Sequence, residues 1–148
     1  MEDYTTLSRE EFNTKFVAAF KKYIHKDFYG IESLPGWNNL IWTLTETLAR
    51  YAGHSKTPFK ISQIKQKFGG LRYYCSGNET MQGMVDLAES LSFTLCEKCG
   101  ARGVLDTDYG YVLTLCPFHK EERNREKEVL RRKFRGRVSE RSTPSPTF

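Results

Sequence analysis

Four side chains in the second half of the chain have the types and the spacing of a metal site. Cys96 and Cys99 form a Cys-x-x-Cys pair, and Cys116 and His119 form a Cys-x-x-His pair further along. A tight turn aims two thiolates at one ion, and the start of a helix supplies two more ligands. Because four protein ligands leave no open coordination position, this Cys₃His set predicts one structural zinc ion instead of a catalytic one.

The cysteines also allow two other interpretations. A Cys-x-x-Cys pair alone is typical of a redox site as well, and four cysteines could be unrelated to one another. The first residues are acidic and polar, unlike a secretory signal, and no run of about eighteen apolar residues occurs. We therefore expect a cytoplasmic protein without a membrane span, where matched spacing favours a metal over disulfides. Cys75 is expected to be a small buried group on a strand.

Secondary structure around the two pairs has to position the four ligands. Residues 103–105 and 111–115 are apolar and flank a polar turn, which predicts a β-hairpin between the pairs. Residues 120–134 are rich in Glu, Lys and Arg with a narrow apolar seam, which predicts a helix that begins at the last two ligands. A knuckle, a hairpin and a helix in this order predict a treble-clef-like zinc finger over residues 93–134.

The preceding residues 1–92 predict a small α+β core. Ser8 and Glu11 form a capping-box pattern at the start of a helix over residues 8–26. A second helix begins near residue 40 and is expected to stop at Gly53, after a loop at residues 29–37. Strands at residues 58–68 and 71–75 are expected to be joined by a turn at the glycine pair, and a helix follows at residues 79–91. This order of elements is typical of the α+β class.

The excess positive charge is concentrated near the C-terminus. Residues 120–141 hold ten Lys or Arg and five Glu, whereas the rest of the chain holds 13 Lys or Arg and 13 Asp or Glu. Such a basic helical arm, followed by a flexible basic tail at residues 135–148, favours contact with nucleic acid. A charged helix end with a solubilising tail is the alternative. The candidate phosphate contacts in the arm are Arg131, Arg132, Lys133, Arg135 and Arg137.

A second basic segment surrounds the glycine pair and could present backbone amides and cations to a phosphate or a partner. The candidate residues are Lys65, Lys67, Gly69, Gly70 and Arg72. A hairpin turn with solvated charges is the simpler interpretation, since the P-loop pattern is absent.

Several aromatic and histidine residues also have a functional and a structural interpretation. Stacking of bases on Trp37, Trp42, Tyr73 or Tyr74 is a further hypothesis, and their strand or helix spacing favours the core instead. His25 and His54 are expected at helix ends, without a catalytic role.

The chain resembles a family of small, mostly uncharacterised bacterial and phage proteins. The motifs that carry the resemblance are Gly36-Trp37 before a helix, the Lys-Phe-Gly-Gly-Leu-Arg-aromatic turn at residues 67–73, and the Cys-Glu-x-Cys-Gly and Cys-x-x-His pairs. The resemblance spans residues 37–119. It implies the core-plus-finger architecture and a functional or packing role for the turn, and it implies no reaction.

Three functions remain as hypotheses. The first is a non-enzymatic zinc-finger protein that engages nucleic acid or a nucleoprotein complex. The second is a phage or prophage protein that acts in the host cytoplasm and binds a host protein such as a defence or transcription factor. The third is a nuclease with a structural zinc, for which the sequence offers no set of activating residues.

Overall fold

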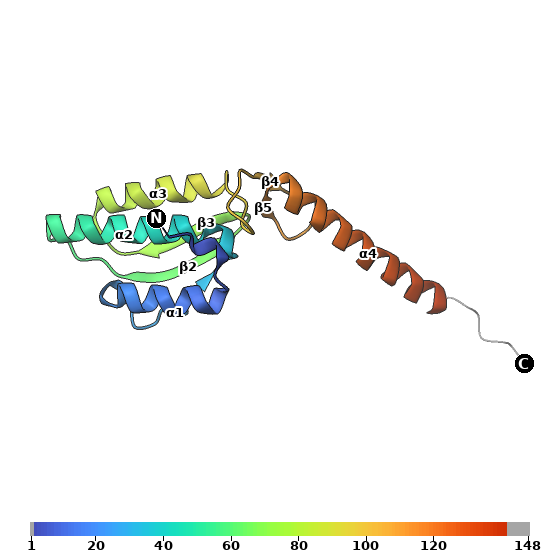
Figure 1. Ribbon diagram of the computed structural model, residues 1–148, viewed down its shortest axis with the longest axis horizontal. Helices are drawn as coiled ribbons and strands as arrows, with labels where there is room; N and C mark the ends of the chain where they lie inside the picture. The colour runs from blue at the N-terminus through green and yellow to red at the C-terminus, as the bar shows by residue number, and fades with distance from the viewer. Residues whose placement is uncertain (1, 142–148) are drawn as a thin grey trace, which may run out of the picture. The chain divides into compact units, whose positions relative to one another are not determined.

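The computed structural model describes residues 2–141, and it has the mixed α+β composition that the sequence predicts (Figure 1). The chain divides into two compact units, the first ending at Cys116 and the second beginning at Pro117. Over the described residues, we find no helix with the length and apolar character needed to cross a bilayer.

The first helix, α1 (Arg9–Phe20), begins as its sequence predicts. The Ser8 hydroxyl accepts from the Glu11 amide at 3.1 Å, and the Glu11 carboxylate accepts from the Ser8 amide at 3.2 Å, completing a capping box. Its phenylalanines at every fourth position are buried, which fixes the face that meets the core. The helix ends earlier than residue 26, because a 3-10 turn at Lys21–Tyr23 follows it.

Helices α2 (Asn38–Ser55) and α3 (Glu79–Ser92) pack beside each other. The expected stop at Gly53 is wrong: Gly53 is helical, and α2 ends where Lys56 adopts a left-handed φ of 55°. The Asn78 side chain caps α3 by accepting from the Met81 amide at 3.0 Å. The helix at residues 79–91 is therefore confirmed.

The main sheet has the strand order β1-β2-β3, formed by β1 (Ile31–Glu32), β2 (Ile61–Lys67) and β3 (Gly70–Cys75). β1 pairs parallel with β2, and β2 pairs antiparallel with β3. The segment at residues 29–37 is thus not only a loop, because two of its residues form β1. A strand of two residues is too short to show a periodic sequence pattern. The turn also lies one residue earlier than expected, at Phe68-Gly69 instead of Gly69-Gly70.

The two faces of the β2–β3 hairpin differ in character. Ile64 faces Tyr73 in the register, and both side chains are buried in the core with Leu71. The opposite face carries Lys65 and Arg72, which face each other and are only partly buried. Side chains alternate between faces along a strand, so a basic row lies on the side of the hairpin away from the core.

The finger segment contains the strands β4 (Val104–Asp106) and β5 (Leu113–Leu115), which pair antiparallel and confirm the expected hairpin. Helix α4 (Pro117–Arg141) follows in the second unit. It continues past residue 134, so residues 135–141, expected in the tail, are helical. Four of these seven residues are Arg or Glu, which favour helix, and Gly136 alone does not end it. The rest of the expected tail, residues 142–148, lies outside the described residues.

Candidate metal centre

The four predicted ligands lie together. One ligand atom each from Cys96, Cys99, Cys116 and His119 lies within 4.8 Å of the other three. The Sγ atoms of Cys99 and Cys116 are 3.8 Å apart. Two thiolates on one tetrahedral zinc with bonds of about 2.3 Å would be separated by about 3.8 Å, so the arrangement fits such an ion. The cluster can hold a metal and is consistent with zinc.

The first two ligands stand on a tight turn. The Gly100 amide donates to the Cys96 carbonyl at 2.8 Å, and the Cys96 amide donates to the Ala101 carbonyl at 2.7 Å. Gly100 has a φ of +82°, a backbone conformation that glycine adopts without steric cost. The glycine after the second cysteine therefore lets the chain reverse around the two thiols.

Loss of hydration and the neighbouring thiols both disfavour ionisation of Cys99. Loss of hydration, assisted by hydrogen bonds with the neighbouring Cys96 and Cys116 thiols, raises the pKa of Cys99 to about 11. Three clustered thiolates would repel one another unless a cation lay between them, since like charges disfavour ionisation. The cluster is thus built to exchange protons for a metal ion.

The knuckle is braced by the Gly36-Trp37 segment of the core. The Gly36 amide donates to the Glu97 carbonyl at 2.7 Å, and the Trp37 indole donates to the Leu95 carbonyl at 2.9 Å. A Cβ atom on Gly36 would overlap the carbonyl oxygens of Cys96 and Glu97. Only glycine leaves room for this approach, so the Gly-Trp motif fixes the metal turn on the core.

Glu97 is a buried carboxyl inside the Cys-x-x-Cys turn. Its Oε2 accepts from the Leu34 amide at 3.1 Å, while Oε1 has no hydrogen-bond partner among the described residues. Burial raises the pKa of the Glu97 carboxyl, against the opposing effects of the Leu34 amide, Gln66 and Arg9. Glu97 thus forms a second tie between the knuckle and the loop before α2, one that the sequence analysis missed.

The glycines of the predicted phosphate turn have packing roles. A Cβ atom on Gly69 would overlap Leu105 of β4, and one on Gly70 would overlap the ring of Phe93. The Gly69 carbonyl accepts from the Thr114 hydroxyl of β5 at 2.7 Å. Gly69 and Gly70 therefore seat the β2–β3 turn on the finger hairpin, and this contact accounts for the motif without a phosphate.

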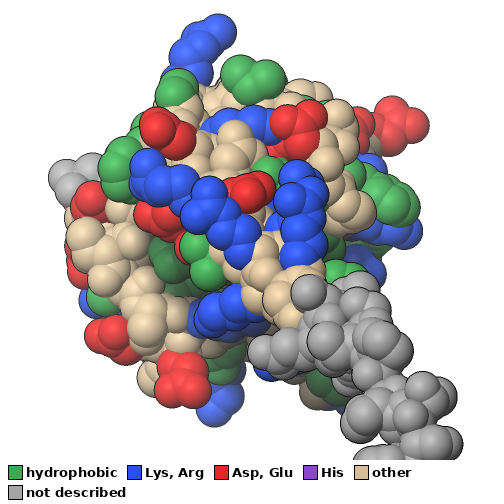
Figure 2. Space-filling model, turned by 90° about the vertical axis from the view of Figure 1, so that its right-hand side faces the viewer, with side chains coloured by type: hydrophobic (Ala, Val, Ile, Leu, Met, Phe, Trp, Pro, Cys, Tyr) green, Lys and Arg blue, Asp and Glu red, His purple; other side chains and the backbone are tan. Residues whose placement is uncertain are grey.

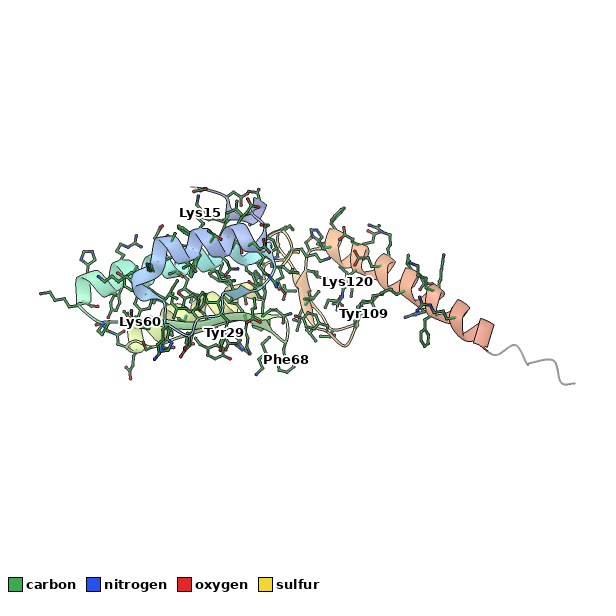
Figure 3. The ribbon with its side chains drawn as sticks, turned by 90° about the horizontal axis from the view of Figure 1, so that it is seen from below. Lys15, Tyr29, Lys60, Phe68, Tyr109 and Lys120 are labelled. Carbon is green, nitrogen blue, oxygen red and sulfur yellow. The ribbon has the colours of Figure 1, made fainter. Side chains whose placement is uncertain are left out.

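Phe68 is the unexpected residue of that turn. It has a φ of +53° and Gly69 has +82°, so both central residues adopt the positive φ of a type I′ turn. A left-handed conformation costs roughly 1–2 kcal/mol for a non-glycine residue, and Asn is the usual choice. The side chain is 70% exposed and so gains little from packing (Figure 3). Strain without compensating burial points to a functional role.

The Phe68 side chain borders a pocket of about 250 Å³ between the β2–β3 turn and the loop that joins β4 to β5. Tyr111, which is 64% exposed, lines it from the loop, with Gln66 and Lys67 on the strand side. The Gln66 amide donates to the Val112 carbonyl at 2.7 Å and holds the two segments together. The pocket is therefore framed by two tied hairpins and two exposed aromatic residues.

The basic candidates fall into two groups, one in each unit. In the first, Lys65, Lys67 and Arg72 belong to the outward row of the β2–β3 hairpin, and none of them forms an ion pair within the described residues. The second lies on α4, where Arg131 and Arg132 lie 3.8 and 3.3 Å from the Glu128 carboxylate.

Acidic side chains are interspersed among the basic ones on α4. Lys133, Arg135 and Arg137 of this helix are exposed. Acidic and basic side chains are likewise mixed on the face of the whole molecule that Figure 2 shows. The positive charge of α4 is therefore partly neutralised by its own glutamates.

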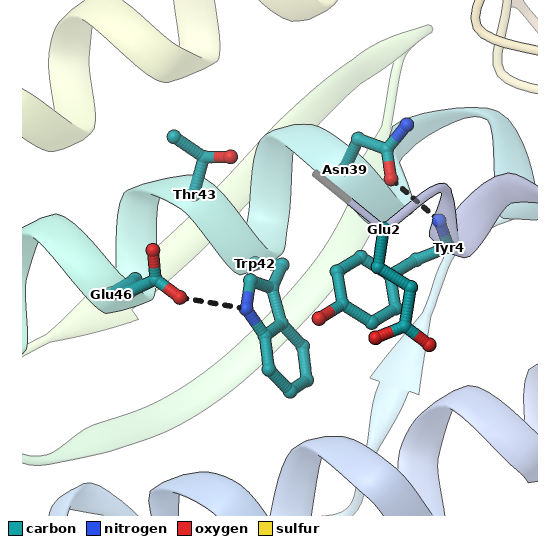
Figure 4. Close-up of a pocket in the computed structure, with 6 residues that line it drawn as sticks. All are labelled: Glu2, Tyr4, Asn39, Trp42, Thr43 and Glu46. Atoms are coloured by element: carbon teal, nitrogen blue, oxygen red, sulfur yellow. Dashed lines mark hydrogen bonds between the residues drawn. The ribbon is translucent and has the colours of Figure 1, made fainter.

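Most of the predicted stacking aromatics belong to the core. Trp37 and Tyr73 are buried, and Trp42 stacks on Tyr4 with ring centroids 4.3 Å apart (Figure 4). The pocket of about 400 Å³ beside Trp42 is lined by groups that bond one another: its indole donates to Glu46 at 3.0 Å, and the Tyr4 amide donates to Asn39 at 2.7 Å. The Tyr4–Asn39 bond anchors the N-terminal segment on α2, whereas the Trp42–Glu46 bond lies within that helix.

The other residues considered in the sequence analysis, Tyr74, His25, His54 and Cys75, do not belong to the metal cluster. Tyr74 is the exposed member of the aromatic set, on the outward row. His54 lies in the last turn of α2, as expected. His25 does not lie at the end of α1, because that helix ends at Phe20 and His25 follows a 3-10 turn and an isolated bridge at Ile24. Burial raises the pKa of the Cys75 thiol to about 11, with a contribution from Glu89, in keeping with a small partly buried group on β3.

Comparison of the chain with protein-family models, with curated proteins and with solved structures found no match. The functional interpretation therefore depends on the geometry of the site. Sequence patterns identified the ligands and the basic residues but missed Phe68 and Tyr111. The signal for Phe68 was a Phe-Gly pair at a hairpin turn, where Asn-Gly is the common choice.

Proposed function

We propose that the chain is a non-enzymatic binding protein in which a structural zinc ion shapes a treble-clef-like finger. A closed Cys₃His site has no position for a substrate or an activated water, so the metal would stabilise the fold. A knuckle at Cys96–Cys99, the β4–β5 hairpin, and a helix whose first turn holds His119 form the order of elements in such a finger. The resemblance to small bacterial and phage proteins supports the same architecture.

Nucleic acid is the proposed partner. The observation that carries this proposal is the cross-strand pair of Lys65 and Arg72, two cations directly opposite each other. Like charges at such a position destabilise a sheet, and neither has an ion-pair partner within the described chain. Glu32 lies beside Lys65 in the parallel register, so the pair retains one excess positive charge, which a phosphate backbone crossing it would neutralise. The exposed basic residues of α4 would add contacts of the same kind.

Fluorescence anisotropy with labelled oligonucleotides tests this function. We expect the affinity to fall steeply as salt rises, since released counterions drive phosphate binding. The double variant Lys65→Glu/Lys67→Glu and the triple variant Arg131→Glu/Arg132→Glu/Lys133→Glu should both weaken binding. The variant Lys21→Glu/Lys26→Glu makes the same charge change as the first, at exposed residues outside the row, and should change the affinity much less. Binding that is absent or independent of salt would contradict the proposal.

A host protein is the alternative partner, for a phage or prophage protein. The observation in its favour is the exposure of Val104 and Leu105 on β4, at 73% and 41%. The two side chains lie on opposite faces of the strand, and Leu105 also packs against Gly69, so Val104 offers the apolar contact to a protein partner. A defined complex that survives nuclease treatment and is lost in Val104→Asp would favour this alternative over nucleic acid.

A further inference from the structure

The pocket between Phe68 and Tyr111 is not explained by the metal centre or by the packing of the hairpins. We propose that it is a stacking site for an unpaired base of a single-stranded nucleic acid, with Lys67 and the Lys65–Arg72 pair holding the adjoining phosphates. This inference rests on the proposed function and names the form of nucleic acid that the site takes.

The first argument is the conformation of Phe68. A bulky residue in the left-handed region is an outlier, and here it projects a 70% exposed ring from a turn that Asn would form with less strain. The turn cannot relax, because Gly69 is packed on Leu105 and hydrogen-bonded to Thr114. The backbone that carries the ring is thus fixed, and a phenylalanine side chain has only two rotatable bonds, so little conformational entropy is lost when a flat ligand stacks on it.

The second argument is the size and the lining of the pocket. Its volume of about 250 Å³ is below the range of about 300–1,000 Å³ typical of sites for drug-sized ligands, so a single ring system suits it. Two exposed rings line the pocket, Phe68 from the β2–β3 turn and Tyr111 from the loop between β4 and β5. The Gln66 amide that ties the two hairpins keeps these sides together. Aromatic side chains bind unpaired bases by stacking and tolerate any base sequence.

The third argument is the charge that leads to the pocket. Lys67 lines it and lies over the Phe68 ring, with Nζ 5.8 Å from the ring centroid. Lys65 and Arg72 continue the row along the hairpin toward the exposed ring of Tyr74. Glu32 stands beside Lys65 in the parallel register, and the row remains net positive. From Tyr74 to Phe68 the row spans roughly 20 Å at about 3.3 Å per residue, enough for several nucleotides.

A duplex suits this surface poorly. In double-stranded nucleic acid the faces of the bases are stacked on one another and are not available to Phe68 or Tyr111. Single-strand binders instead combine a positive track for the backbone with aromatic rings for the bases. The base faces and the phosphates are common to DNA and RNA, so oligonucleotides of both kinds are needed in the test.

The variant Phe68→Asn separates binding from folding. It creates the Asn-Gly pair that a type I′ turn prefers, so the thermal midpoint should stay the same or rise. Stacking is worth enough that its loss should weaken the affinity for a labelled oligo-dT or oligo-U by roughly 5- to 150-fold. Tyr111→Ala should weaken it as well. Tyr29→Ala removes a ring that is 85% exposed and lies outside the pocket, and it should leave the affinity unchanged (Figure 3).

Anisotropy titrations of the zinc-loaded protein against oligo-dT, oligo-U and a duplex of equal length measure these effects. If Phe68→Asn loses affinity for the single strands and not for the duplex, the stacking site is supported. Whether the loss occurs with oligo-dT or with oligo-U identifies the ligand as DNA or RNA. Salt-dependent binding that is unchanged in Phe68→Asn, or equal for the duplex, overturns the stacking site and leaves the proposed function standing. Absence of binding to all three oligonucleotides overturns both.

Discussion

The backbone amide of Gly36 donates a hydrogen bond to the carbonyl oxygen of Glu97 across 2.7 Å. The bond joins the segment before α2 to the turn that carries the first two metal ligands. The Glu97 side chain returns to the same segment through the Leu34 amide. In both bonds an amide of the core segment donates and Glu97 of the knuckle accepts, so the metal centre depends on core packing as well as on its ligands.

Replacement of Gly36 by Ala should damage this connection. The added methyl group overlaps the backbone carbonyls of Cys96 and Glu97, which cannot rotate away as a side chain would. We expect a loss of about 1–3 kcal/mol or more in the free energy of unfolding, together with weaker zinc binding. Gly53→Ala is the control, because it meets no atom within 4 Å in α2 and should be neutral or slightly stabilising. Equal stability of the two variants in urea denaturation would contradict the brace.

Replacement of Gly70 by Ala should cost about 1–3 kcal/mol, because the new methyl group overlaps the Phe93 ring. In the double variant, Phe93→Leu should make room for the new methyl group and recover part of the lost stability. If the two substitutions acted independently, their losses of stability would simply add. Gly83→Ala, in the interior of α3 with open space around it, should instead stabilise by roughly 0.5–1 kcal/mol. Thermal unfolding of the four variants measures all of these differences.

Substitution of a clustered cysteine and of Cys75, which lies outside the cluster, should have different effects on zinc content and stability. Cys99→Ser removes one of four clustered ligands, and we expect loss of stoichiometric zinc and destabilisation by about 3 kcal/mol or more. Cys75→Ser, on β3 away from the cluster, should retain one zinc per chain. Elemental analysis and thermal unfolding measure both effects. A full complement of zinc in Cys99→Ser would rule that thiol out as a ligand.

Metal binding should release protons. The pKa of Cys99 is raised to about 11 in the metal-free cluster, so its thiol is protonated at pH 7 and must lose its proton to bind. The apparent zinc affinity should therefore fall as the pH falls. Calorimetric titrations at one pH in two buffers with different ionisation enthalpies measure the number of protons released. A heat that is the same in both buffers would mean that the thiols are already ionised.

The Glu97→Gln variant should change how stability depends on pH. Because burial raises the pKa of Glu97 in the folded state, its protonated form is favoured there. Its stabilising contribution is present in full below the unfolded pKa and is lost as the pH rises through the folded pKa. The stability of the wild type relative to Glu97→Gln should thus be greatest in acid and decline toward neutral pH. The difference between their unfolding free energies, measured at fixed excess zinc, should show this trend. A constant difference would place the carboxyl in a solvated environment.

Local sequence patterns predicted much of the fold for identifiable reasons. The capping box at Ser8 and Glu11, the helical period of α2 and α3, and the paired metal motifs each involve residues close in sequence. The errors occur where tertiary contacts decide. β1 has two residues and exists because it pairs with β2. α2 passes Gly53 because a single glycine costs a helix only about 1 kcal/mol, and the left-handed residue that ends the helix is Lys56.

The metal ligands were predictable because spacing alone expresses their chemistry. The sequence showed that Gly36, Gly69 and Gly70 belong to motifs. It could not show why glycine is needed there, because a Cβ atom at each position would overlap residues that are distant in sequence. Glu97 resembled a solvated charge within Cys-Glu-Lys-Cys, and only burial against Leu34 shows otherwise. Phe68 carried a local signal, the unusual residue of a type I′ turn, whose meaning depended on knowing where the turn begins.

The Cys₃His centre is tested most directly by X-ray absorption at the zinc edge on untagged protein, with elemental analysis of the same sample. One zinc per chain is expected, with three sulfur neighbours at about 2.3 Å and one nitrogen neighbour at about 2.0–2.1 Å. Such a shell would match the cluster of Cys96, Cys99, Cys116 and His119. Protein without stoichiometric zinc, or a shell in which oxygen replaces sulfur or nitrogen, would contradict the closed site from which the proposed function starts.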